Sequence, residues 1–380
     1  NTYLPGRASV RVRAGQLTPV QAQLIPRADS PLAGWSAVNL AREYPDDMTV
    51  RPHPACRPSV AFTDEGIVAV WAHGGDLWTS RSSDGRSFTQ PRKLPVPVST
   101  AWVETQPQLL RESSGRWVLL FISDRTPQHT RDTYVCFSQD LKTFSNPQKT
   151  NLQSQVGNFI PDQRGGFLFA GAGGTLHKGL MIDFYSSQNW VDWRRGQRLE
   201  AKDINFHYIP ARARRLDDGR ILVACGNRQE DKLFVGLTES GESWISQGVY
   251  PLSTEQGREA TSDAAPAILS QGNSALILSS PQRWKLHGGG SVGRMIGVVW
   301  VDNGEVTQYG LLENMLGLPW PSLGGESDAK WGHVIAWQDE AQGSPHLLLG
   351  QDFESFRPSG TQLAIALQKN QRKKEIQRRR

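Results

Sequence analysis

Charged and hydrogen-bonding side chains gather at the ends of the apolar runs in this chain of 380 residues. They stand where a Pro-led run begins, or between the second and third runs of one unit. If the runs are neighbouring strands around a common axis, these positions converge at one mouth, and convergent polar groups in a hollow indicate a binding site. For any single residue, the alternative is a solvated loop tip. The set comprises Arg57, Asp76, Glu104, Gln106, Asp124, Arg125, His129, Arg131, His207, Tyr208, Arg228, Glu230, Asp263, Arg283, His287, Glu326 and Asp328.

A repeated turn motif indicates what would position these side chains. Residues 82–88 read S-S-D-G-R-S-F, and degenerate copies follow at 138–144, 187–193 and 238–244. Their third positions fall at 84, 140, 189 and 240, a period of 49 to 56 residues. Such a period predicts a repeat architecture, in which about 40–50 residues make one propeller blade. Within each turn, we expect the Asp or Ser oxygen to accept backbone N–H bonds, and the last aromatic to pack under the next strand.

Short apolar runs between these turns predict strands throughout the chain from Trp35 onward. Each unit begins with a Pro-led run, as at 58–62 and 107–110, and continues with two more runs. These runs are expected to be apolar at successive positions, without alternating polar residues, because propeller blades bury both faces of their inner strands. The pattern predicts an all-β, six-bladed propeller, with five blades as the alternative. We expect residues 35–50 to supply the outer strand of the last blade, and 362–367 to form a further strand.

Composition divides the chain into four predicted parts. In residues 1–27, apolar and polar residues alternate, which predicts two strands with a turn between them. The segment resembles part of a carboxypeptidase-regulatory-like or PEGA-type β-module, and the alternative is a simple extension packed on the main domain. Residues 28–34 are a linker, 35–368 the propeller and 369–380 a basic tail. Seven basic residues and one acidic residue give the tail a net charge of +6, so the rest carries −1 of the total of +5. The tail is expected to contact acidic surfaces, and no basic face on the fold favours specific nucleic-acid binding.

Several classes of function find no support in the sequence. The eight histidines are scattered without a metal-binding spacing, and no cofactor motif is present, so we expect neither metal nor cofactor. Three cysteines cannot close a disulfide framework, and we interpret them as buried thiols. No apolar run reaches the length of a transmembrane helix. Because the chain begins at Asn1 without a leader, we interpret it as a processed product or a piece of a longer protein, and expect an extracellular or periplasmic location.

Taken together, the Pro-led first strands, the D-G-R turn before a second strand and the S-x-D-G-x-x-[F/W] turns resemble the Asp-box (BNR-repeat) propellers of the sialidase superfamily. The resemblance covers about 330 residues and implies a catalytic centre at the axis, away from the turns. It further implies an arginine triad that grips a carboxylate, a Tyr nucleophile activated by Glu, and an Asp acid/base.

The resemblance supplies candidate roles for residues of this chain. Asp76 takes the place of the acid/base, while Tyr208 and Glu230 are the candidate nucleophile and activator, although Tyr208 lies in a different blade from the family's nucleophile. Arg57 stands one residue closer to Pro58 than the family pattern, with Cys56 at the expected position. The candidate substrate-binding residues are Arg57, Arg125, Arg228, Arg283, Arg294 and Asp263.

These observations favour a carbohydrate-active propeller, in the form of an exo-glycosidase acting on a polar or anionic sugar of a glycan or glycoconjugate. The alternative is a non-catalytic propeller that binds glycan or protein and has lost its nucleophile. The convergent polar residues favour the first interpretation. The displaced Arg57, and the lack of a convincing Tyr in the blade where the family has its nucleophile, favour the second.

Overall fold

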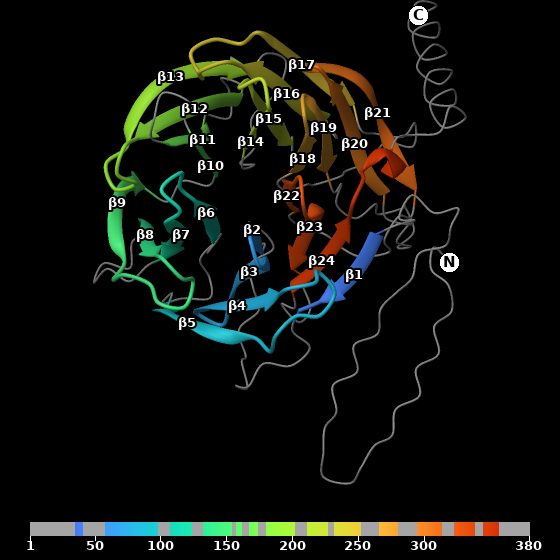
Figure 1. Cartoon of the computed structure of the whole chain (residues 1–380). Helices are drawn as coiled ribbons and strands as arrows, with labels where there is room; N and C mark the ends of the chain where they lie inside the picture. The colour runs from blue at the N-terminus through green and yellow to red at the C-terminus, as the bar shows by residue number, and fades with distance from the viewer. Residues whose placement is uncertain are drawn as a thin grey trace, which may run out of the picture.

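A computed structural model shows six four-stranded antiparallel sheets arranged as blades around a central axis (Figure 1). The described part of the chain is therefore a β-propeller of six sheets, as the repeats predicted. The structure describes residues 35–40, 58–97, 107–123, 132–153, 157–161, 167–173, 180–201, 211–226, 232–251, 266–279, 295–313, 323–338 and 345–356. The predicted N-terminal module, linker, 362–367 strand and basic tail lie outside these residues and stay predictions.

Every blade begins with a short strand beside the axis and runs outward, so β2, β6, β10, β14, β18 and β22 surround the centre (Figure 1). Blade 1 contains β2 (Ser59–Thr63), β3 (Gly66–His73), β4 (Asp76–Ser82) and β5 (Arg92–Pro97). Blade 2 contains β6 (Gln108–Arg111), β7 (Trp117–Ser123), β8 (Asp132–Ser138) and β9 (Gln148–Gln153). Blade 3 contains β10 (Gly157–Pro161), β11 (Phe167–Gly173), β12 (Leu180–Ser187) and β13 (Arg194–Ala201). Blade 4 contains β14 (Arg212–Arg215), β15 (Ile221–Gly226), β16 (Lys232–Thr238) and β17 (Ser246–Pro251). Blade 5 contains β18 (Ala267–Gln271), β19 (Ser274–Ser279), β20 (Met295–Asp302) and β21 (Glu305–Glu313). Blade 6 contains β22 (Gly324–Asp328), β23 (Gly332–Gln338), β24 (Pro345–Gly350) and β1 (Trp35–Asn39), and a 3₁₀ turn, η1 (Glu354–Phe356), follows β24.

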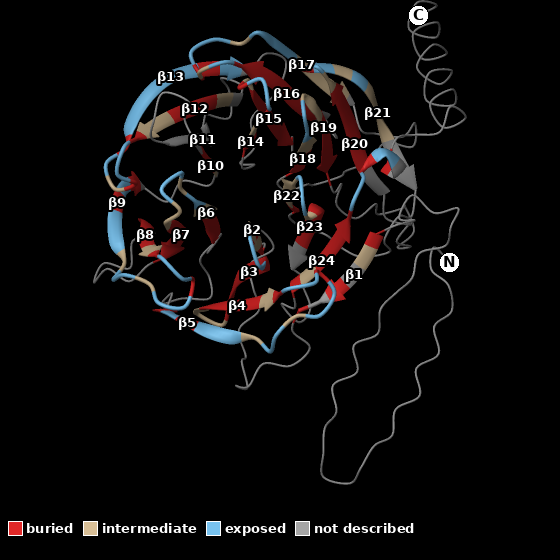
Figure 2. Ribbon diagram, in the orientation of Figure 1, coloured by how far each residue is buried: buried red, intermediate tan, exposed pale blue. Residues whose placement is uncertain are grey.

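Apolar side chains fill the six interfaces between adjacent blades. Strand β3 is buried along its whole length, and its residues alternate between two interfaces. Val68 and Val70 join the cluster shared with blade 2, whereas Ile67, Ala69 and Trp71 join the cluster shared with blade 6. A strand covered on both faces is apolar at every position, which explains why the inner runs show no alternation. The outer strands β5, β9 and β13 carry exposed residues instead (Figure 2).

The ring closes through β1, the outer strand of the sixth blade. β1 pairs antiparallel with β24, from Trp35 opposite Gly350 to Asn39 opposite His346. This confirms the expected outer strand for 35–39, while 41–50 lie outside the described residues. Trp35 is 2% exposed and packs edge-on against Phe356, with ring centroids 5.1 Å apart. The first described strand is thus held by the last blade, a closure that joins distant parts of the chain.

The repeated turns connect the third and fourth strands of blades 1 to 4. In the first, Asp84 Oδ1 accepts hydrogen bonds from the backbone N–H groups of Ser87 and Arg86, both at 2.8 Å, and Gly85 takes φ +71°. These bonds hold the pKa of the Asp84 carboxyl at about 2. Blade 5 has no such motif because a two-residue turn at Asn303 and Gly304, both with positive φ, joins β20 to β21.

Candidate functional site

A cavity of about 250 Å³ lies on the propeller axis. Five of the six axial strands contribute to it, which makes it the point where blades 2 to 6 meet. The lining residues are Gln108, Leu110, Asn158, Phe159, Ile160, Arg212, Ala213, Arg214, Arg215, Pro266, Ile268, Gly325 and Glu326.

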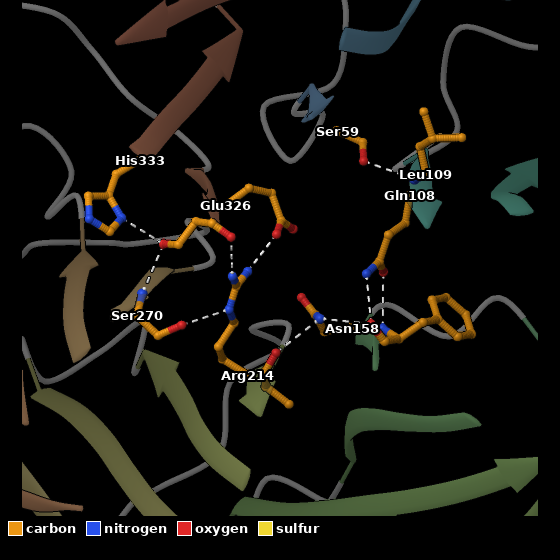
Figure 3. Close-up of polar contacts among 11 residues, drawn as sticks. Ser59, Gln108, Leu109, Asn158, Arg214, Ser270, Glu326 and His333 are labelled. Carbon is orange, nitrogen blue, oxygen red and sulfur yellow. Dashed lines mark hydrogen bonds and ion pairs between the residues drawn. The ribbon is translucent and has the colours of Figure 1, made fainter. Parts of the chain in front are cut away.

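Polar side chains join each axial strand to the next around the first part of this ring (Figure 3). The axial strand is one edge of its sheet, so its backbone groups need partners from outside the sheet. Ser59 Oγ accepts the backbone N–H of Leu109 at 2.9 Å, which links β2 to β6. Gln108 binds both backbone groups of Phe159, at 2.9 and 3.0 Å, and links β6 to β10. Asn158 Nδ2 donates to the carbonyl of Ala213 at 3.1 Å and links β10 to β14.

Arg214 continues the ring and reaches across the axis. Its guanidinium donates through Nε to Ser270 Oγ on β18 at 3.0 Å, and through Nη2 to the Ser327 carbonyl on β22 at 2.9 Å. Its Nη1 binds Glu326 Oε2 at 2.5 Å (Figure 3). The ion pair therefore connects blade 4 with blade 6 past the intervening blade 5. With side-chain exposures of 20% for Arg214 and 36% for Glu326, the pair is partly shielded from solvent.

Behind this ion pair, a chain of hydrogen bonds ends at a buried histidine. The backbone N–H of Ser270 donates to Ser327 Oγ at 3.0 Å, and that hydroxyl lies 2.9 Å from His333 Nδ1. Ser327 Oγ therefore accepts from the backbone of Ser270 and is also hydrogen-bonded to the His333 ring, where the tautomer decides which of the two atoms donates. Burial, followed by the nearby charge of Arg214, lowers the pKa of His333 to about 4.

The described residues that line the cavity carry a net positive charge. They include three arginines, Arg212, Arg214 and Arg215, and one carboxylate, Glu326, which binds Arg214. Arg212 is only 2% exposed and lies close to Cys225, whose thiol pKa is raised to about 12 by burial.

Asp76, the predicted acid/base, begins β4 at the same end of blade 1 as the start of β2. Its carboxylate forms an ion pair with Lys93 on the outer strand at 3.0 Å. The next blade repeats this arrangement, since Asp132 at the start of β8 binds Lys149 of β9 at 2.7 Å. Both acids lie six residues before a motif serine, Ser82 or Ser138. A strand-pairing role common to two blades accounts for the position of Asp76, and Asp76 is not among the lining residues of the cavity.

The other predicted site residues lie outside the described part of the chain, so the structure does not place them relative to Asp76 or the cavity. They are Tyr208, Glu230, Arg57, Arg125, Arg228, Arg283, Arg294 and Asp263.

The cavity instead uses residues within the axial strands, most of which the sequence interpretation missed. Glu326 was among the predicted polar residues, but Gln108, Asn158, Arg212 and Arg214 were not. A signal existed, because polar residues interrupt short runs that are otherwise apolar, as in P-Q-L-L at 107–110 and A-R-A-R-R at 211–215. In a strand buried on both faces, such residues indicate a polar partner or a cavity.

The described residues contain no group of three or more His, Cys, Asp or Glu side chains that could hold a metal ion. They also contain no helix long and apolar enough to cross a membrane.

Comparison with solved structures shows the propeller fold in proteins of low sequence identity. A protein of unknown function from Dyadobacter fermentans matches with a TM-score of 0.52 and 14% identity, over 83% of this chain and 99% of that one. The GH93 α-L-arabinofuranosidase of Fusarium graminearum, solved with arabinobiose, matches with a TM-score of 0.51 and 9% identity, over 80% and 95% of the two chains. The α-L-arabinanase of Penicillium chrysogenum, also solved with arabinobiose, matches with 0.51 and 12%, over 88% and 99%.

Neither the protein-family models nor the curated proteins yield a match to this chain. The structural likeness therefore shows the β-propeller fold that this chain shares with propeller glycoside hydrolases, and nothing narrower at these identities.

Proposed function

We propose that this protein is a carbohydrate-active propeller that binds a sugar in its axial cavity. The observation that carries the proposal is the cavity itself, where polar side chains from several blades converge on one hollow. Convergent polar groups in an otherwise apolar wall are typical of small-ligand sites. Two of the similar structures were solved with arabinobiose, which makes a sugar the first ligand to test.

The size of the cavity favours a single sugar residue. Its volume of about 250 Å³ lies below the roughly 300–1,000 Å³ typical of sites for drug-sized ligands. A site for one terminal residue corresponds to exo action on a glycan or glycoconjugate. The excess of Arg212, Arg214 and Arg215 over Glu326 supports a polar or anionic sugar, because planar guanidinium groups match carboxylates with two parallel hydrogen bonds.

In the enzymatic form of the proposal, the protein is a sialidase-like exo-glycosidase. Asp76 would act as acid/base, with Tyr208 and Glu230 as nucleophile and activator. Arg57, Arg228 and Arg294 would act as the anion grips, and Arg125, Arg283 and Asp263 are the further proposed substrate-binding residues. An extracellular or periplasmic location would give such an enzyme access to glycans.

A second candidate is a non-catalytic propeller that binds glycan or protein. The repeated ion pairs favour it, because Asp76 is held by Lys93 as Asp132 is held by Lys149. Most glycoside hydrolases need two carboxylates about 5–10 Å apart at the scissile bond. Among the described residues that line the cavity, Glu326 is the one carboxylate.

Calorimetric titration with L-arabinose, D-galactose, D-galacturonate and N-acetylneuraminate tests the binding step. Binding of at least one sugar is expected, and Leu110→Trp should weaken it at least tenfold by filling the half-buried cavity wall. Ile245→Trp is the matched control, since Ile245 is 51% exposed and does not line the cavity. Binding that survives Leu110→Trp in a folded protein would place the sugar elsewhere and refute the axial site.

Fluorogenic α-L-arabinofuranosides and sialosides then separate the two candidate functions. Turnover by the wild type that disappears in Asp76→Asn but persists in Asp132→Asn would support the glycosidase. Sugar binding without turnover of any glycoside would support the non-catalytic propeller.

A further inference from the structure

The Arg214–Glu326 pair differs from the other polar contacts around the axis. Ser59, Gln108 and Asn158 each bind a backbone group of the next axial strand, so their contacts are part of the scaffold. Glu326 binds only a side chain, and this side chain comes from a strand on the far side of blade 5. The position of the Glu326 carboxylate is therefore determined by Arg214 and not by the neighbouring backbone.

Only one oxygen of the Glu326 carboxylate is used within the described structure. Oε2 accepts the bond from Arg214, whereas Oε1 has no hydrogen bond to a described residue. The side chain lines the cavity and keeps 36% of its surface exposed. A carboxylate oxygen can accept two hydrogen bonds and donates none when ionised. Oε1 is thus a charged acceptor available inside the cavity.

Arg214 holds this acceptor in one orientation. Its Nε and Nη2 are bound to Ser270 and Ser327, on two different strands, and these bonds fix the plane of the guanidinium. The remaining Nη1 then determines where Glu326 Oε2 lies. Because Arg214 already holds the Glu326 carboxylate in place, Glu326 loses little rotamer entropy when a ligand binds to it.

We infer that Glu326 is a specificity-determining residue that selects a hydroxyl, and rejects an anionic group, at its end of the axial cavity, with Arg214 as its positioning residue. The inference rests on the proposed sugar binding. A sugar hydroxyl donates to Oε1, whereas a ligand carboxylate at the same place would face a like charge. An anionic group of the sugar is therefore directed away from Glu326.

Glu326→Gln tests this directly, because the amide changes the polarity of the site while keeping its shape. With its carbonyl oxygen toward Arg214, glutamine presents an N–H₂ donor to the cavity in place of an acceptor. Hydrogen bonds to charged groups contribute enough that their loss weakens binding by about tenfold or more. The probes are D-galactose and D-galacturonate, which differ only in the oxidation of C6.

We expect Glu326→Gln to weaken D-galactose binding about tenfold and to shift the ratio of the two dissociation constants toward D-galacturonate by more than tenfold. Arg214→Lys keeps the positive charge but not the planar fork, and should weaken both sugars several-fold with little change in that ratio. Glu112→Gln is the matched control, because Glu112 forms a comparable ion pair with Arg116 at 2.7 Å away from the cavity. It should leave the ratio as in the wild type.

Thermal melting of each variant identifies loss of fold, and a folded Glu326→Gln protein with the wild-type ratio would overturn the inference. If the wild type binds none of the four sugars named above, the proposed function fails as well. Sugar binding by the wild type together with an unchanged ratio in Glu326→Gln refutes the role of Glu326 alone.

Discussion

Lowering the pH from 7 to 5 should destabilise this propeller through two buried histidines. His333 is 3% exposed, and its Nδ1 lies within hydrogen-bond distance of Ser327 Oγ, at 2.9 Å. Protonation would place a charge in a buried site near Arg214, which Asp352 offsets only in part. Burial likewise lowers the pKa of His73 to about 4. Each histidine is therefore neutral in the folded protein and protonates more readily when the chain unfolds.

The direction and size of the effect follow from these pKa values. Because the folded pKa lies below the unfolded value of 6.5, the stabilisation is complete above pH 6.5 and is lost as the pH falls toward 4. For a folded pKa of about 4, the loss between pH 7 and pH 5 is about 2 kcal/mol per histidine. Two such groups are a substantial share of the 5–15 kcal/mol typical of folded domains.

Urea unfolding at both pH values, followed by tryptophan fluorescence, measures this loss in the wild type and in His333→Asn. The asparagine amide can accept from or donate to Ser327 Oγ in place of Nδ1 and does not titrate. We expect the free energy of unfolding to fall by about 2 kcal/mol less in the variant than in the wild type. The pKa values of Asp84 and Asp140, lowered to about 2 by backbone hydrogen bonds, place their titration below this window. Equal losses in the two proteins would refute the assignment of a neutral, buried His333.

Three further predictions concern the scaffold and the candidate acid. Asp76→Asn should lower the melting temperature by a few degrees at most, since it breaks a partly exposed pair with Lys93, and Asp132→Asn, at a more buried position, should lower it by at least as much; a larger shift for Asp76→Asn would contradict a strand-pairing role for both acids. Trp35→Ala should cost about 3–5 kcal/mol in urea unfolding because it opens the blade 6 closure, while exposed Ile245→Ala costs under about 0.5 kcal/mol. Gln108→Leu removes two hydrogen bonds to the backbone of Phe159, whose carbonyl keeps the contact with Asn158 Nδ2 at 3.3 Å, so a loss of about 1–3 kcal/mol is expected; an unchanged unfolding free energy would refute this role for the amide.

Local patterns made the propeller predictable because a blade is built from short-range features. The turn at 82–88 carries its own hydrogen-bond acceptor, and its copies mark the end of the third strand in four blades. The continuous run at Ile67–Trp71 showed that both faces of a strand are covered. First strands without a clear apolar run, such as Gly157–Pro161 and Gly324–Asp328, were missed. Gly324 and Gly325 carry no apolar side chain that would mark a strand. They are required by packing, because a Cβ on either would lie 3.0 Å from a backbone oxygen of a neighbouring blade.

The candidate site was harder to predict, because its groups come together only after the ring closes. Predictions from strand-end position placed Asp76 at the site, but its nearest partner is Lys93 on the outer strand of its own blade. Glu326 was singled out without a partner, since Arg214 is 112 residues away in sequence. Such a pair has no local spacing that a motif could reveal.

The amino-acid sequence by itself determined the repeat and the β class, since turn chemistry and apolar periodicity act over a few residues. Tertiary structure alone decided which polar side chains face the axis. Each axial strand leaves one edge unpaired, and the neighbouring blade must satisfy that edge, so Gln108, Asn158 and Arg214 acquire their partners only when six blades surround one centre. The ion pair of Arg214 with Glu326 then follows from the geometry of the closed ring.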